Sequence, residues 1–227
     1  MSYALEYIGL SQRIGKTEAI RGVDLRLEKG KVIGLLGPRN SDTATLLRLA
    51  SGLLLPTTGK VRVLGQTPGV ETKRRVAYLP EQLVLPNWMT VRQSIRYFQD
   101  FYENFNLIKA EAICAKLKIN QTARIKSLGK GVRRNTQLML TLARDAELYL
   151  LDEPFGGGEP QVILDTILTN YQKGTTLVIS THQVQEVQTV LDEVVFFKKG
   201  KVVLQKTKDE IGEQGSSIGA LYREVFE

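Results

Sequence analysis

The amino-acid sequence predicts an α/β fold with a mainly parallel core sheet that is interrupted by a helical insertion. Short apolar runs, which are typical of buried strands, alternate with helical patterns near both ends of the 227-residue chain. The stretch between them, roughly residues 87–143, has helical patterns only. Strands that alternate with helices form parallel sheets, so the middle stretch is expected to be an insertion into an α/β body.

The first part of the chain predicts a strand, a loop and a helix in that order. Val23, Leu25 and Leu27 alternate with polar residues, as in a half-buried strand. Gly52 is placed to end the first helix. The segments expected here are strands at 23–27, 31–36, 60–64 and 76–79 and a helix at 43–51.

The insertion opens with a helix start signal. Thr90 precedes Gln93 by three residues, which is the spacing of a capping box. The apolar positions of this helix are Val91, Ile95, Phe98 and Phe101. Further helices are expected at 109–118, 131–144, 162–171, 183–191 and in the tail 207–227, and strands at 147–151, 175–180, 193–198 and 201–205.

Composition excludes some classes of protein. The longest apolar runs are much shorter than a membrane span needs, and no secretory signal opens the sequence. A net charge of +7 could suit nucleic acid, but the basic clusters are scattered and no recognition motif accompanies them. The one cysteine, Cys114, is expected to be a small buried apolar residue in a cytosolic protein.

The loop that follows the second predicted strand is a natural place to bind an anion. The N–H groups at a helix N-terminus point outward, and the helix dipole favours negative charge. In a working phosphate-binding loop, a glycine lets the backbone approach, a lysine neutralises the outer phosphates and a hydroxyl binds Mg²⁺. The residues considered for nucleotide binding are Gly37, Asn40, Ser41, Asp42, Thr43, Ala44 and Thr45.

Three of the elements that such a loop needs are missing. The glycine position is Asp42, the lysine position is Thr43 and the hydroxyl position is Ala44. At about 4 Å and an effective dielectric constant near 20, a unit charge pair is worth roughly 4 kcal/mol, and between Asp42 and a phosphate its sign is repulsive. Taken alone, the loop would be an ordinary strand-to-helix turn.

Polar residues follow three other predicted strands. Asp152 and Glu153 end an apolar strand, where α/β folds bind ligands, so Asp152 could hold Mg²⁺ and Glu153 could polarise a water. His182, the only histidine, follows the next strand; it is either a γ-phosphate contact or a structural residue. Gln82 follows the strand before the insertion, where a glutamine could sense a metal and a nucleophilic water.

A fourth segment has glycines at the start of a predicted helix. This arrangement suits anion binding, although a flexible helix cap is the simpler interpretation. The segment consists of Leu128, Gly129, Lys130, Gly131 and Val132.

In this order the motifs resemble those of the ATP-binding cassette (ABC) ATPases, over about residues 5–205. The resemblance is closest to cytosolic ATPase subunits of bacterial exporters, which often have Ser-Lys-Gly-Met where this chain has residues 129–132. It implies a P-loop NTPase-like ABC ATPase fold with an antiparallel β subdomain. The implied division is a core of residues 1–86 and 145–206, a helical subdomain of 87–144 and a helical tail of 207–227.

The resemblance also implies roles for single residues. Gln82 would be the Q-loop glutamine, which also approaches Mg²⁺, and Asp152 the metal-binding Walker B aspartate. Glu153 would be the catalytic glutamate and His182 the switch histidine. Besides the missing Walker A lysine and hydroxyl at Thr43 and Ala44, three positions depart from the family pattern: Gly129 replaces the signature serine, Glu159 the D-loop aspartate and Ile14 the aromatic that stacks on adenine.

ATP and Mg²⁺ are the implied cofactors, but the changes at residues 42–44 predict little or no binding at the chain's own site. The expected partners are a second ABC ATPase subunit, in a heterodimer rather than a homodimer, and integral membrane transporter subunits; no nucleic acid is expected. The expected location is the cytoplasmic face of the cell membrane. Two alternatives remain: an active ATPase in which Arg39 replaces the lysine, and a regulatory ABC-fold protein without a transport role.

Overall fold

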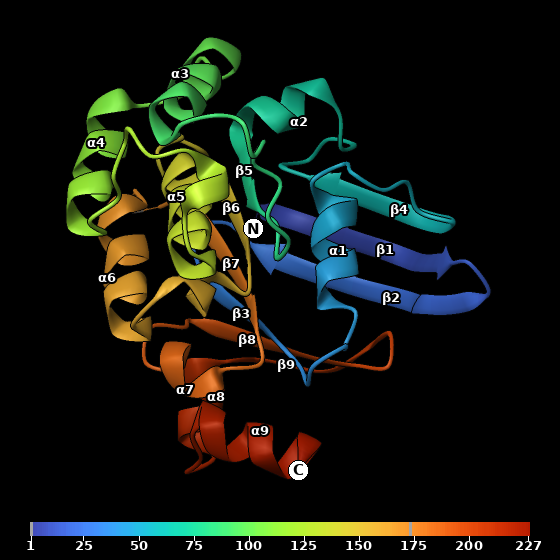
Figure 1. Cartoon of the computed structure of the whole chain (residues 1–227). Coiled ribbons are helices and arrows are strands. Elements are labelled where there is room, and N and C mark those ends of the chain that lie inside the picture. The colour runs from blue at the N-terminus through green and yellow to red at the C-terminus, as the bar shows by residue number, and fades with distance from the viewer. Residues whose placement is uncertain (1, 173) are drawn as a thin grey trace.

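The computed structural model describes residues 2–172 and 174–227 and confirms the α/β fold (Figure 1). In these residues the larger sheet has the strand order β5-β6-β7-β3-β8-β9. All neighbours in it are parallel except β8 and β9, which form the expected antiparallel hairpin. Its strands are β3 (Val32–Leu36), β5 (Val76–Leu79), β6 (Leu148–Asp152), β7 (Thr176–Thr181), β8 (Glu193–Lys198) and β9 (Lys201–Thr207).

A second sheet is antiparallel, with the order β2-β1-β4, and it confirms the expected β subdomain. Its strands are β1 (Tyr3–Ile14), β2 (Thr17–Glu28) and β4 (Thr58–Val63). The sequence did not predict β1. Its pairing with β2 shifts register several times, including between Tyr7 and Leu10 around the left-handed Gly9, so the alternation of apolar and polar residues is broken.

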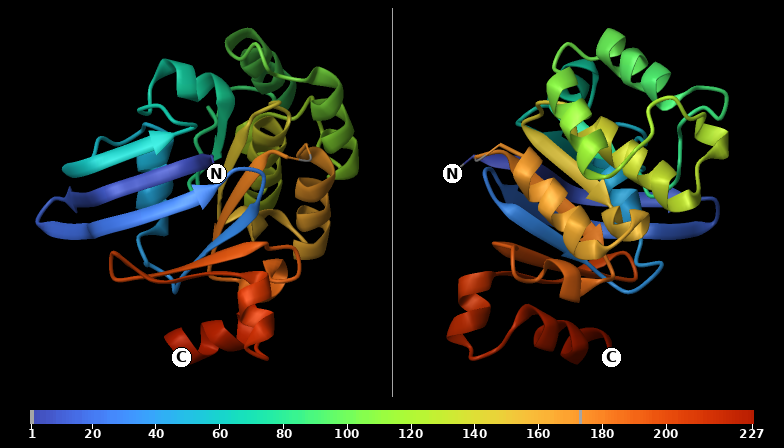
Figure 2. Two further views of the ribbon diagram at one scale, coloured as in Figure 1. Left: turned by 180° about the vertical axis from the view of Figure 1, so that it is seen from behind. Right: turned by 60° about the vertical axis from the view of Figure 1, so that its left-hand side comes forward.

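Helices cover both faces of the larger sheet. The helices α3 (Val91–Phe101), α4 (Leu107–Lys116) and α5 (Lys130–Leu142), with the 3₁₀ turn η1 (Ile125–Ser127), lie between β5 and β6 in the chain. They gather beside α6 (Pro160–Asn170), whereas α1 (Thr43–Ala50) lies against the antiparallel sheet and the short α2 (Val70–Arg75) precedes β5 (Figures 1 and 2). Alternate residues of β6 face the two sides: Tyr149 and Leu151 pack under the inserted helices, and Leu148 and Leu150 pack toward α1.

Two helical predictions need correction. The helix expected at 183–191 is a single turn, α7 (Val184–Val187), followed by turns. Gln183 offers no capping side chain, and Thr189 and Val190 are β-branched residues with low helix propensity, so nothing extends the turn. In α3 the capping box of Thr90 and Gln93 is confirmed, but Phe101 is 67% exposed and points away from the core.

The tail is helical on both sides of Gly215, as expected. It consists of α8 (Lys208–Glu213), which Thr207 and Glu210 cap reciprocally, and α9 (Ile218–Phe226). The rings of Tyr222 and Phe226 pack on Phe196 of β8 at centroid distances of 5.7 and 5.4 Å. This aromatic contact holds α9 under the edge of the larger sheet (Figure 1).

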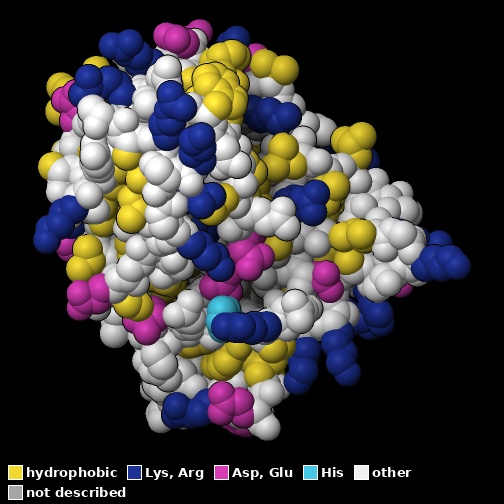
Figure 3. Space-filling model, in the orientation of Figure 1, with side chains coloured by type: hydrophobic (Ala, Val, Ile, Leu, Met, Phe, Trp, Pro, Cys, Tyr) yellow, Lys and Arg dark blue, Asp and Glu magenta, His cyan; other side chains and the backbone are white. Residues whose placement is uncertain are grey.

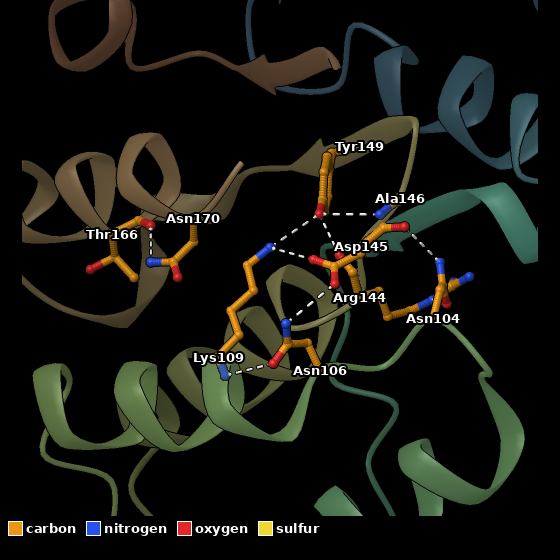
Figure 4. A network of polar contacts seen from close by, with 9 residues as sticks. All are labelled: Asn104, Asn106, Lys109, Arg144, Asp145, Ala146, Tyr149, Thr166 and Asn170. Atoms are coloured by element: carbon orange, nitrogen blue, oxygen red, sulfur yellow. Dashed lines mark hydrogen bonds and ion pairs between the residues drawn. The ribbon is translucent and has the colours of Figure 1, made fainter. Parts of the chain in front are cut away.

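A polar network joins the inserted helices to the start of β6 (Figure 4). Lys109 of α4 lies 3.4 Å from both Asp145 Oδ1 and the hydroxyl of Tyr149. Arg144 is buried and donates to the carbonyls of Lys73, Arg74 and Val76, while its guanidinium stacks on Tyr102. Burial lowers the pKa of Lys109, and Asp145 opposes that shift. The network joins the inserted helices to the edge of the sheet where the parallel strands begin. The loop of residues 37–45 lies at the opposite edge, where these strands end.

Candidate functional site

The parallel strands β3, β6 and β7 carry the loop 37–45, the pair Asp152 and Glu153, and His182 to one edge of the sheet. Leu36 at the end of β3 lies opposite Thr181 of β7, and Asp152 at the end of β6 lies opposite Ser180. The loops after these strands therefore converge, as they do in other open α/β sheets. They enclose a cavity of about 680 Å³. Its lining consists of residues 37–45 together with Glu81, Leu83, Lys130, Arg134, Asp152, Glu153, Gly156, His182 and Gln183.

The loop between β3 and α1 has the backbone of an anion-binding loop without its side chains. Asn40 and Asp42 both adopt left-handed conformations, with φ of 65° and 68°, which glycine adopts with the least strain. Thr43 and Ala44, in the first turn of α1, line the cavity, and the N–H of Thr45 donates to the carbonyl of the N-cap residue Asp42 at 3.0 Å. Burial raises the pKa of Asp42, and Arg21 only partly offsets this. The loop thus presents a carboxyl where its shape would favour an anion.

Asp152 and Glu153 differ in their surroundings. Asp152 is buried at the end of β6, where Ser180 Oγ donates to its Oδ1 at 2.5 Å. Burial raises the pKa of Asp152, and the hydrogen bond from Ser180 lowers it by a smaller amount. The negative charges of Glu81 and Glu153 raise it further. Glu153 has a left-handed backbone (φ 44°) and accepts hydrogen bonds from Thr181 Oγ1 and from the backbone N–H of His182, both at 2.9 Å.

His182 links this carboxylate to the loop. Its Nδ1 lies 2.6 Å from Glu153 Oε1, and its Nε2 accepts a hydrogen bond from Nε of Arg39 at 3.2 Å. The single histidine is visible in cyan in Figure 3, between magenta acidic side chains and a dark blue basic one. Arg39, His182 and Glu153 therefore form a chain of polar contacts across the mouth of the cavity.

The charges that line the cavity do not favour a polyanion. Among the residues that the structure describes, the cavity lining has three basic side chains, Arg39, Lys130 and Arg134, and four acidic ones, Asp42, Glu81, Asp152 and Glu153. With His182 neutral, the formal charge is −1. Arg134 is moreover buried and committed to backbone carbonyls, so only Arg39 and Lys130 remain to meet a ligand.

Arg134 and Gln137 are two residues of α5 that the sequence analysis missed. The Arg134 guanidinium donates to the carbonyls of Pro80, Glu81, Asp152 and Glu153. The Gln137 amide donates to the carbonyls of Pro80 and Gln82 and accepts from the N–H of Val84. Together they hold residues 80–84 against the end of β6. The sequence alone carried no signal for them, because their burial depends on how α5 packs; once buried, the Arg134 charge needs such partners.

Several predicted site residues lie away from the cavity. Gln82 is exposed and lines a neighbouring groove, whereas Glu81 lines both hollows. Ile14 is half exposed at the end of β1 and contributes to neither. Glu159 is the exposed N-cap of α6.

Of the segment 128–132, only Lys130 lines the cavity; Gly129 is the N-cap of α5, Leu128 is half-buried and Val132 is exposed.

The neighbouring groove, of about 710 Å³, runs between α1, β5 and α3. Its walls include Tyr78, Phe98 and Tyr102 together with Arg48, Lys73 and Arg144. Trp88, Tyr97 and Phe101 are exposed on the same inserted segment, at 66%, 45% and 67%. The rings of Tyr97 and Phe101 lie 4.4 Å apart, so these two side chains form an exposed aromatic pair.

Comparison with known proteins gives one family. A protein-family model described as ABC transporter matches residues 20–156, more than half of the chain. The chain is 27% identical to the daunorubicin resistance ATP-binding protein DrrA3 of Streptomyces coeruleorubidus, over 98% of this chain and 74% of that protein. It is 24% identical to a Nod factor export ATP-binding protein I of a Rhizobium strain, over 98% and 76%.

Solved structures agree on the fold. The ATP-binding subunit of an ABC transporter superposes with a TM-score of 0.86 at 24% identity, over 97% of this chain and 98% of that one. A bacterial ABC transporter cassette in a dimeric structure gives a TM-score of 0.76 at 17% identity, over 89% and 98%. Among the described residues, no helix is long and apolar enough to cross a membrane.

Proposed function

The chain belongs to the ABC transporter family, as an ATP-binding domain, and we propose that it is a degenerate subunit that acts on ATP held by a second ATPase subunit. In this proposal its own loop at residues 37–45 binds MgATP weakly or not at all. Its contribution is the segment 128–132 at the start of α5, which it presents to the nucleotide of its partner. The pair is a heterodimer, and only the partner has a complete phosphate-binding loop.

The observation that carries the proposal is the chemistry of the cavity beside α1. Thr43 and Ala44 supply neither the cation nor the metal-binding hydroxyl that MgATP requires in such a loop. Asp42 adds a negative charge at the N-terminus of α1, and the lining has a formal charge of −1. These residues do not fit a nucleoside triphosphate with its magnesium ion. We therefore assign no hydrolytic step to Asp152, Glu153 and His182 in this chain.

The start of α5 supports a role toward a partner. Gly129 and Lys130 are exposed, and Gly129 is the N-cap, so the free N–H groups of the first turn are open to an anion. No acidic residue lies in the first turn of α5. The loss of a serine hydroxyl at Gly129 weakens a contact with phosphate but leaves the backbone donors and the Lys130 charge.

The groove between α1 and α3 supports a membrane partner. Phe98 and Tyr102 of the inserted segment line the groove, and Trp88 and Phe101 of the same segment are exposed. Large exposed apolar side chains of this kind favour a surface that another protein covers. We propose that integral membrane transporter subunits cover this surface and hold the chain at the cytoplasmic face of the membrane. Relatives named for drug resistance and for Nod factor export support an exporter.

The test is to purify the tagged chain from its native host in mild detergent and to identify what accompanies it. We expect a second ABC ATPase with a lysine at the position equivalent to Thr43, and a membrane protein. The isolated chain should give no binding isotherm with micromolar MgATP, while the complex hydrolyses it. A homodimer without either companion would favour a regulatory protein and contradict the proposal, as would micromolar binding by the chain alone.

One rival has an observation in its favour. Arg39 lines the cavity and contacts His182, so a guanidinium does lie near the place of an outer phosphate. In that rival function the chain is an active ATPase in which Arg39 replaces the missing lysine. ATP turnover by the isolated chain, abolished in Arg39→Ala, would establish it.

A further inference from the structure

Two glycines bring the start of α5 against the 3₁₀ turn η2 (Pro154–Gly157), which follows Glu153. A Cβ atom built on Gly131 would lie 3.0 Å from the carbonyl oxygen of Gly157, and one built on Gly157 would lie 3.2 Å from the carbonyl oxygen of Gly131. Both distances are tighter than ordinary van der Waals contact. The two backbones therefore meet without side chains between them.

Asn135, one turn further along α5, occupies the space that a side chain at position 157 would need. A Cβ on Gly157 would lie 1.8 Å from Asn135 Oδ1 and 2.7 Å from its Cγ. Gly157 does not have a positive φ, so glycine is required there by this contact and not by the backbone conformation. The Asn135 amide and the Gly157 backbone thus set the distance between α5 and η2.

The Asn135 side chain is unusual for a buried amide. It is 8% exposed, and its Oδ1 has no hydrogen-bond partner within residues 2–172 and 174–227. A buried acceptor left without a donor typically costs about 1–3 kcal/mol. Buried polar groups are nearly always paired, so one that is not needs a reason other than stability.

We propose that Asn135 is a positioning residue that locks α5 to η2, so that the start of α5 and Glu159 after η2 meet the partner's nucleotide as one unit. This inference rests on the proposed function, in which the chain works on ATP held by a second ATPase subunit. Without the lock, the segment 129–131 and Glu159 would move independently. Asn135 acts by fixing the backbone of α5 relative to that of η2, and it does not itself touch the nucleotide.

The decisive variant is Asn135→Ala. Replacement of the unpaired amide by a methyl group removes the contact with Gly157 without a clash, so the melting temperature of the chain should be unchanged or higher. Turnover of MgATP by the purified complex should nevertheless fall at least about fivefold in kcat, with KM nearly unchanged, because misplaced groups weaken the transition state and not the bound substrate. A residue with a purely structural role would change stability and not kcat.

A second pair of variants tests the same contact from the other side. Gly157→Ala places a methyl group against Asn135 and should destabilise the chain and reduce kcat. Gly158→Ala is the matched control, because a Cβ there would lie 3.9 Å from Asn135 Nδ2, in ordinary contact, and the extended backbone (φ 165°) accepts alanine. The double variant Asn135→Ala/Gly157→Ala removes the clash with the Asn135 amide and leaves only the 3.2 Å approach to the Gly131 carbonyl oxygen. It should regain most of the lost melting temperature but keep the low kcat.

The outcomes separate the two proposals. If the wild-type complex hydrolyses MgATP no faster than the second ATPase subunit alone, the proposed function fails. If the complex is active and Asn135→Ala turns over at the wild-type rate, the lock is overturned while the proposed function stands. Recovery of full kcat in the double variant would also overturn it, because stability alone would then explain the loss in Gly157→Ala.

Discussion

Arg39 donates a hydrogen bond from Nε to Nε2 of His182 over 3.2 Å. A guanidinium has donors only, so Nε2 must be the acceptor of the ring, and the proton of a neutral imidazole then lies on Nδ1. That proton points at Oε1 of Glu153, 2.6 Å away. These two hydrogen bonds orient the His182 ring toward the Glu153 carboxylate. They also hold Arg39, the basic residue of the loop 37–45, against the cavity.

The substitution Arg39→Ala separates the two interpretations of this contact. If the loop does not hold ATP, isothermal titration with MgATP should show no micromolar binding for the wild-type chain and none for the variant. If Arg39 stands in for the missing lysine, the wild-type chain should bind and the variant should lose at least about tenfold in affinity, equivalent to about 1.4 kcal/mol. Arg92→Ala, on the exposed face of α3, is the control for a general loss of charge.

Restoring the missing chemistry should create a nucleotide site. The triple variant Asp42→Gly/Thr43→Lys/Ala44→Ser removes the repulsive charge and supplies the cation and the hydroxyl, on a loop whose backbone already has two left-handed residues. We expect MgATP affinity to rise at least about a hundredfold, since one charge pair near 4 Å is worth roughly 4 kcal/mol at an effective dielectric constant of 20. The control is the triple variant Asp42→Gly/Thr43→Met/Ala44→Ser, which supplies the hydroxyl but no cation. Equal affinity of the two triple variants would contradict the electrostatic argument.

Asp42 predicts a pH-dependent effect on stability. Burial raises its pKa, so the folded chain binds a proton more tightly than the unfolded chain. Stability from this group is therefore highest below the unfolded pKa of 3.8 and declines as pH rises through the raised folded pKa. Asp42→Asn, which keeps a residue that tolerates the left-handed backbone, should stabilise the chain at pH 7.

Urea denaturation of Asp42→Asn and wild type from pH 7 downward would check this. The difference in the free energy of unfolding should shrink as the pH approaches 3.8. A gain that is independent of pH would point to relief of backbone strain and not of charge.

Arg144 should be required for the stability of the joint between the inserted helices and β6. It is 4% exposed and donates to three backbone carbonyls and to Asn104 Oδ1. Arg144→Lys keeps the positive charge but loses the planar guanidinium with its several N–H donors. Hydrogen bonds of a charged group are worth about 1.5–3 kcal/mol each. We expect a loss of about 2–4 kcal/mol in urea denaturation.

The comparison for this variant is Arg96→Lys on the exposed surface of α3. It should change the free energy of unfolding by no more than about 0.5 kcal/mol. If Arg144→Lys behaves like that control, the network in Figure 4 does not stabilise the joint.

The sequence determined most of the site because its signals are local. Apolar runs gave the parallel strands, and residues that directly follow a run, such as Asp152 and His182, must lie at the edge where parallel strands end. The sequence alone also shows that position 43 has a threonine where a phosphate-binding loop needs a lysine. The family follows from the order of the same motifs.

Tertiary structure alone decided which of these residues face one another. Periodicity does not show that Glu81 and not Gln82 lines the cavity, because the carbonyls of residues 80–82 are held by Arg134 and Gln137 from a helix more than fifty residues away. Nor does it show that Asn135 fills the space beside Gly157, or that Arg39 reaches His182. Local propensity specifies strands and helices, but side-chain contacts between distant elements depend on how those elements pack, and that information exists only in the folded chain.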